Sequence, residues 1–172
     1  MFKFNAQGEY RPNPPQKMPV DLRSISRGLS KEELRGEILR IESLMDTMED
    51  SKLDLEVVNH FTPGVYAREL TIPTGTLLTG KIHRFEHLCV VSKGDISVLS
   101  EDGFKRIKAP FTFVSKPGVK RLAYVHEETV WTTFHANPDE VRDPEALVER
   151  HTAPNYEALG ETEVPVLDGG VL

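Results

Sequence analysis

Two kinds of hydrophobic pattern divide the chain, and the first is helical. Apolar side chains recur at steps of four, three, four and three residues, at Leu34, Ile38, Ile41, Met45 and Met48. This spacing places them along one face of a helix. The sequence that comes before them, Ser30-Lys31-Glu32-Glu33, has the form of a capping box. The pattern predicts an amphipathic helix over residues 30–50.

From Leu55 onward the pattern changes to short runs of β-branched and aromatic residues, separated by glycine- and proline-containing turns. Closely spaced turn signals are typical of an all-β sandwich or barrel. No helical segment intervenes, which favours antiparallel pairing. The sequence therefore predicts a mainly β protein with one antiparallel barrel over residues 55–137. The expected strands are 55–59, 65–72, 77–84, 87–92, 95–100, 104–108, 111–115, 119–126 and 129–136.

The segments that flank the predicted barrel look different. Residues 1–29 contain four prolines and are expected to form an extended arm. Residues 138–172 contain Asp143-Pro144-Glu145, which is typical of a helix start, so a short helix to about Arg150 and then a second arm are expected. The apolar face of the helix over residues 30–50 has to be buried, either against the barrel of the same chain or against a partner. We therefore predict a homo-oligomer formed through helix 30–50 and the arms.

The charge and composition narrow the possible partners. The formal net charge of −6 argues against a nucleic-acid partner, and the absence of a long apolar run argues against a membrane span. The polar start and the single cysteine agree with a cytoplasmic location. Cys89 lies among apolar residues, which favours packing over a role as a nucleophile beside His87.

The segment from Gly75 to Gly94 resembles the first cupin motif, which is a glycine, five residues, His-x-His, three or four residues, a glutamate, six residues and a glycine. Gly75 and Gly94 are its two glycines. The second motif matches only at Gly118, in Lys116-Pro117-Gly118. The likeness from His60 to His135 is greatest to uncharacterised cupin-like proteins of tailed phages and prophages. The resemblance implies a jelly-roll barrel with a pocket at the family's four metal-ligand positions, here Lys81, His83, His87 and Arg121.

Two kinds of pocket chemistry fit these residues. In the first, His83 and His87 bind Fe, Mn, Ni or Zn, with Glu86 or His135 as a third ligand. In the second, Lys81 and Arg121 bind an anion, since lysine and arginine are poor metal ligands.

The resemblance also implies a metal-free enzyme, with His83 or His87 as base and Tyr66 or Tyr124 as acid. A further alternative is an interior filled by its own side chains, with Glu69, Glu86 or Glu127 in structural ion pairs. His60, His126 and His151 are expected in turns or on the surface.

These observations predict a non-catalytic cupin-like protein that acts by binding and assembly. The phage likeness implies a structural or accessory protein of a virion, found in the host cytoplasm or the virion, with other virion proteins as partners. The alternatives are a metal-dependent or His/Tyr enzyme, such as an oxygenase or isomerase, and a soluble protein that binds anionic ligands.

Overall fold

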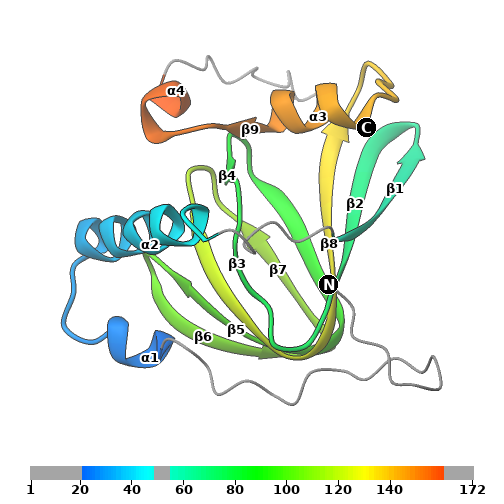
Figure 1. Ribbon diagram of the computed structural model, residues 1–172. Helices are drawn as coiled ribbons and strands as arrows, with labels where there is room; N and C mark the ends of the chain where they lie inside the picture. The colour runs from blue at the N-terminus through cyan, green and yellow to red at the C-terminus, as the bar shows by residue number, and fades with distance from the viewer. Residues whose placement is uncertain (1–20, 49–54, 161–172) are drawn as a thin grey trace.

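A computed structural model describes residues 21–48 and 55–160 of the chain. Its helices and strands are mostly short, and strands dominate (Figure 1). No helix in these two ranges is long and apolar enough to cross a membrane. In chain order the elements are α1 (Leu22–Ile25), α2 (Lys31–Asp46), β1 (Glu56–Thr62), β2 (Gly64–Ile72), β3 (Leu77–Thr79), β4 (Ile82–His83), β5 (His87–Ser100), β6 (Gly103–Lys108), β7 (Phe111–Ser115), β8 (Arg121–Asn137), α3 (Pro144–His151), β9 (Thr152–Ala153) and α4 (Tyr156–Gly160).

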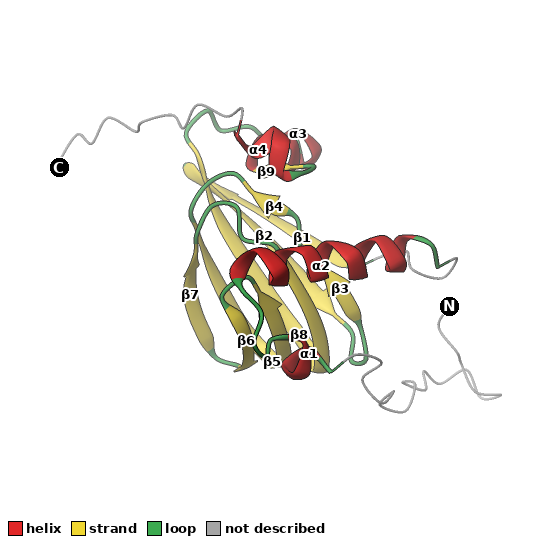
Figure 2. Cartoon of the chain, turned by 90° about the vertical axis from the view of Figure 1, so that its left-hand side faces the viewer, coloured by secondary structure: helices red, strands yellow, loops and turns green. Residues whose placement is uncertain are grey.

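The strands form one large antiparallel sheet and one small one. In the large sheet the order is β1-β2-β8-β5-β6, with β3 also paired to β8 and β7 also paired to β5. The small sheet pairs β4 with β9. The large sheet is strongly curved, with α2 crossing one side and the C-terminal elements lying over one end (Figures 1 and 2). The predicted mainly β, antiparallel class is confirmed.

Three expected strand boundaries are wrong. Segments 87–92 and 95–100 are one strand, β5, and segments 119–126 and 129–136 are one strand, β8. The expected turn Lys93-Gly94-Asp95 is a bulge inside β5, because β8 continues to pair on both sides of it. The expected strand 77–84 is interrupted between β3 and β4 at Gly80 and Lys81.

The bulge in β5 decides which side chains face the interior of the curved sheet. Side chains alternate between the two faces of a strand. The register between β5 and β8 shifts three times between Val91 and Ile96, so the parity of the interior positions changes along β5. As a result, both His87 near the start of β5 and Val98 near its end line the same interior cavity.

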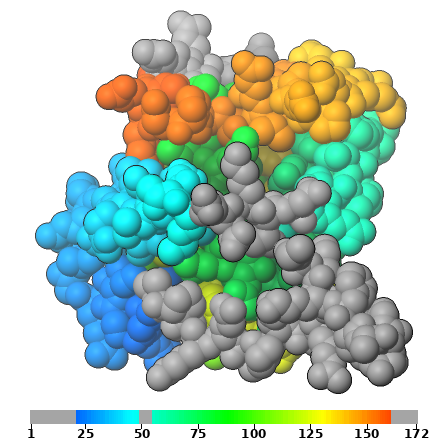
Figure 3. Space-filling model, viewed as in Figure 1, coloured from blue at the N-terminus to red at the C-terminus, as the bar shows by residue number. Residues whose placement is uncertain are grey.

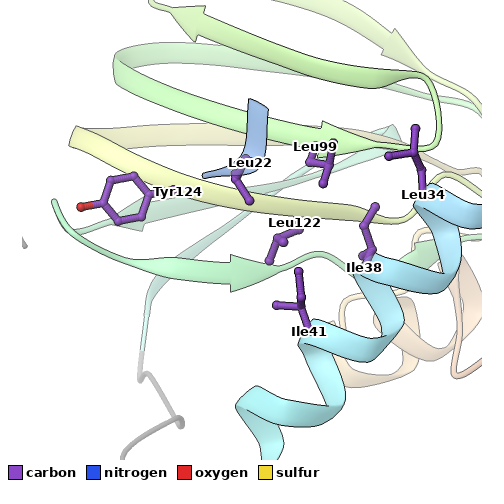
Figure 4. Packing of buried hydrophobic residues seen from close by; sticks show 7 residues of the cluster. All are labelled: Leu22, Leu34, Ile38, Ile41, Leu99, Leu122 and Tyr124. Carbon is purple, nitrogen blue, oxygen red and sulfur yellow. The ribbon is translucent and has the colours of Figure 1, made fainter. Parts of the chain in front are cut away.

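Helix α2 covers the outer face of the sheet of its own chain, which was one of the two predicted alternatives. Leu34, Ile38 and Ile41 are buried against Leu99 and Leu122 of the two longest strands, as Figure 4 shows. The predicted capping box between Ser30 and Glu33 is present. Most of the stripe therefore packs on its own chain, although Met48 at its end is 63% exposed.

The two predicted arms are partly folded. Within 1–29, helix α1 buries Leu22 completely in the core beside α2, while residues 1–20 lie outside the described range. Asp143 caps α3 as predicted, by accepting from the backbone N–H of Glu145. The expected extended arm after α3 is wrong as far as Gly160, because β9 and α4 pack there; residues 161–172 lie outside the described range.

A buried carboxylate beside the bulge makes stability depend on pH. Asp95 accepts two hydrogen bonds from Arg106, at 2.7 and 2.8 Å, and the hydrogen bond from Arg106 lowers its pKa. A carboxyl with a lowered folded-state pKa stabilises the protein above its unfolded-state pKa and loses that effect as the pH falls through the folded-state value.

Replacing Asp95 should therefore cost stability mainly near neutral pH. We expect Asp95→Asn to lower the free energy of unfolding by about 1–2 kcal/mol at pH 7, because Arg106 is half exposed and solvent weakens the pair. The difference from wild type should shrink below about pH 4. Urea unfolding at pH 7 and pH 3 measures this, and an equal difference at both would contradict it.

Candidate metal and anion site

A cavity of about 260 Å³ lies inside the curved sheet, at the end covered by α3. Its walls come from β2, β3, β5 and β8 of the large sheet, from β4 and β9 of the small sheet, and from α3. Ile72, Ile96 and Val98 form part of an apolar cluster at one side of it. One of the predicted alternatives was an interior filled by its own side chains. The cavity contradicts that alternative.

Three histidines from three separate strands meet in this cavity. His83 comes from β4, His87 from β5 and His135 from β8, and one ring nitrogen of each lies within 4.8 Å of the others. The ring centroids are 4.1 Å apart for His83 and His87, 4.8 Å for His87 and His135, and 5.2 Å for His83 and His135. Metal–nitrogen bonds of about 2.0–2.1 Å require ligand nitrogens about 3–4 Å apart, so small side-chain adjustments would let all three bind one ion.

The histidines are in the protonation state that binds metal. Burial lowers the pKa of His83 to about 2 and that of His135 to about 3, and it also lowers the pKa of His87. All three rings are therefore neutral at pH 7. The Nδ1 of His87 lies 3.1 Å from the backbone oxygen of Phe85, which fits an N–H donor at Nδ1 and leaves the lone pair on Nε2.

The main chain also fixes the position of His83, because its backbone is held from two sides. The backbone oxygen of His83 accepts from the N–H of Gly118, at 2.9 Å, and His83 pairs with Thr152 of β9. Its side-chain Nδ1 is buried and has no hydrogen-bond partner among the described residues. A buried nitrogen without a partner is costly, and a bound metal or ligand would remove that cost.

The charged side chains at the cavity are all positive. Arg68, Lys81 and Arg121 line it, and none of its described lining residues is aspartate or glutamate. Arg121 is mostly buried, donates to the Ser115 hydroxyl at 2.9 Å and lies 5.5 Å from the ring centroid of Phe113. The predicted anion-binding residue thus lies in the same cavity as the histidines. Its guanidinium retains further N–H donors for an anion.

Two residues expected at the site lie elsewhere or on its edge. Lys81 lines the cavity, but it lies between two strands and is exposed, so it is a residue of the rim. Glu86 is also exposed and does not line the cavity. His135 is therefore the third member of the histidine cluster, and Glu86 is not.

The two candidate tyrosines differ. Tyr66 is buried and lines the cavity, where its ring stacks on His135 and its hydroxyl donates to Asn59 at 2.6 Å. Tyr124 does not line it: this residue belongs to the apolar cluster that contains Leu22 and Leu122 (Figure 4). The reason is parity, because Arg121 faces the cavity from β8 and residue 124 therefore faces the opposite side.

His151 is a site residue that the sequence analysis wrongly assigned to a turn or the surface. It is only 5% exposed, lines the cavity and stacks on His135 with centroids 4.7 Å apart. Its position four residues after the fully buried Leu147 puts both on one face of α3. That spacing was the signal available in the sequence.

Cys89 also lines the cavity, and its environment favours packing. The side chain is 1% exposed, and burial raises the pKa of the thiol to about 11. Reactive cysteines require a stabilised thiolate. The prediction that Cys89 acts as an apolar residue agrees with these values.

Comparisons with known proteins concern the fold alone. No protein-family model matches the chain, and no curated protein does. Among solved structures, KdgF from Halomonas sp. is 19% identical with a TM-score of 0.43, and the similarity covers 53% of this chain and 88% of that one. An RmlC-like cupin from Shewanella frigidimarina is 18% identical with a TM-score of 0.43, covering 55% of this chain and 84% of that one. The Cnp3 cupin domain of Schizosaccharomyces pombe is 15% identical with a TM-score of 0.42, covering 62% and 71%. At these values no ligand or activity is carried over.

Proposed function

We propose that this chain is a cupin-type protein that binds a divalent transition metal through His83, His87 and His135, together with a small organic acid. The observation that carries the proposal is the meeting of three neutral imidazoles from three strands in one cavity, with His87 and His135 buried and His83 partly buried. Three histidine ligands with further positions open suit Fe(II), Mn(II), Ni(II) or Zn(II). Such an ion would supply Lewis-acid polarisation of an oxygen atom of the bound acid.

The acidic character of the ligand follows from charge balance. Neutral imidazoles do not compensate the two positive charges of the ion, and Arg68 and Arg121 add more positive charge. With no carboxylate among the described lining residues, the compensating charge has to come from the ligand. Arg121 is the residue suited to receive a carboxylate, because its planar guanidinium matches the two oxygens.

Elemental analysis of untagged protein tests the metal directly. We expect about one equivalent of a first-row transition metal per chain in protein purified without chelator, and binding of one equivalent when metal-free protein is titrated with Mn(II) or Zn(II). No more than trace metal in both measurements would contradict the proposal. Tyr66 with one of the histidines would then be the remaining pair for a metal-free isomerase.

The predicted role in assembly concerns other surfaces and stays a prediction. Leu44 of α2 is 51% exposed and Met48, just after α2, is 63% exposed, so a partner could still cover them. Sedimentation measurements test the expected homo-oligomer. Mass spectrometry of purified phage particles tests the virion role, and absence of the protein from mature particles would contradict it.

A further inference from the structure

The C-terminal elements α3 and β9 form a wall across one end of the cavity, and α4 follows them in the chain. In the space-filling view they lie as an orange and red band above the green strands (Figure 3). The wall is firmly attached, because Leu147 is completely buried and Ala153 of β9 is 5% exposed. His151, the last residue of α3, is the histidine that this wall contributes to the cavity.

Backbone and side-chain hydrogen bonds tie this wall to the strand that carries His83. Ile82 and His83 of β4 pair with Ala153 and Thr152 of β9. The backbone N–H of Arg84 donates to the His151 oxygen at 2.8 Å, and its Nε donates to the Thr152 oxygen at 2.9 Å. The position of His151 relative to His83 is therefore set by the fold.

The ring of His151 is packed, but its nitrogens have no hydrogen bonds. It stacks on His135 at 4.7 Å and meets the edge of Phe85 at 5.9 Å. Both Nδ1 and Nε2 are buried without a partner among the described residues. One unsatisfied buried polar group typically costs about 1–3 kcal/mol. The two unsatisfied nitrogens of His151 therefore indicate a hydrogen-bond partner other than the described residues, such as a bound ligand.

We infer that His151 is a ligand-contact residue, and that its N–H donates a hydrogen bond to an oxygen of the bound acid. The inference rests on the proposed function and extends it. His151 does not belong to the group of three ligand atoms that lie within 4.8 Å of one another. It therefore acts beside the metal rather than on it. The acid thus has one oxygen pair at Arg121 and a further oxygen at the C-terminal wall.

Oxalate is a suitable probe, because its two carboxylates offer oxygens to an ion, to a guanidinium and to an imidazole at once. Calorimetry on Mn(II)-loaded protein measures its affinity in wild type and in His151→Phe, which keeps an aromatic ring and removes both nitrogens. We expect at least a tenfold loss of oxalate affinity in His151→Phe, as for a lost hydrogen bond to a charged group. His151→Asn keeps an N–H donor and should lose less.

Metal binding and stability separate this role from a structural one. His151→Phe should bind one equivalent of Mn(II) like wild type and should be at least as resistant to heat, because it removes unsatisfied polar atoms. His60→Phe, which changes an exposed histidine, is the matched control and should bind oxalate normally. Oxalate affinity within twofold of wild type in His151→Phe would overturn the inference while leaving the metal site intact. Failure of wild type to bind either Mn(II) or Zn(II), with no more than trace metal in the purified protein, would instead overturn the proposed function.

Discussion

Gly94→Ala is expected to lower the free energy of unfolding by about 3–5 kcal/mol, a large share of the total of about 5–15 kcal/mol that is typical of a domain. Gly94 lies in the bulge of β5 with a φ of +97°. A Cβ atom there would lie 2.4 Å from the backbone oxygen of Glu128 and 2.7 Å from the Cα of Thr129. These are backbone atoms of the adjacent strand segment, so relief of the clash requires β5 and β8 to separate.

Gly103→Ala is the matched control, because it isolates the cost of the backbone angle. Gly103 has a φ of +102°, and an added Cβ would meet no atom within 4 Å. Its substitution should cost only about 1–2 kcal/mol, the strain of a left-handed conformation. Chemical unfolding of both variants, followed by circular dichroism, measures the difference. Equal losses in the two variants would mean that the close approach at Gly94 does not matter.

Removal of one histidine of the cluster is expected to abolish metal binding under ordinary conditions. His87→Ala and His135→Ala should each weaken binding of Mn(II) or Zn(II) by more than about 100-fold, because loss of a ligand exceeds the 10- to 100-fold cost of losing an outer-shell partner. Both rings are buried, and burial lowers the pKa of each, so both are neutral and available as ligands at pH 7. Competition titrations against a chromophoric chelator measure the affinities.

Two comparisons make this result specific. His60→Ala removes an exposed histidine outside the cavity and should bind metal like wild type. The cluster variants should remain folded. Removal of a buried imidazole leaves a cavity, which is destabilising, but it also removes a polar group whose burial is costly, and the two effects offset each other. Wild-type affinity in both His87→Ala and His135→Ala would exclude these residues as ligands.

Local patterns were sufficient to predict several elements. The stripe from Leu34 to Met48 and its capping box predicted α2, and the Asp143-Pro144 start predicted α3. Both signals are local, because a helix forms its hydrogen bonds within itself. The glycines at 75, 94 and 118 all have positive φ, as expected for turns and bulges.

The sequence by itself determined the antiparallel β class and the amphipathic helix, and its likeness to the cupin motif placed His83, His87 and Arg121 at one pocket. Tertiary structure alone decided for His135 over Glu86 as the third member of the cluster and brought His151 to the cavity. The bulge at Gly94 sets the parity of β5, and pairing along β8 brings Arg121 and His135 to the cavity while it turns Tyr124 away. His151 arrives from a segment 68 residues after His83, through the pairing of β4 with β9. Such contacts depend on the strand register between distant segments, and local periodicity in the sequence does not predict this register.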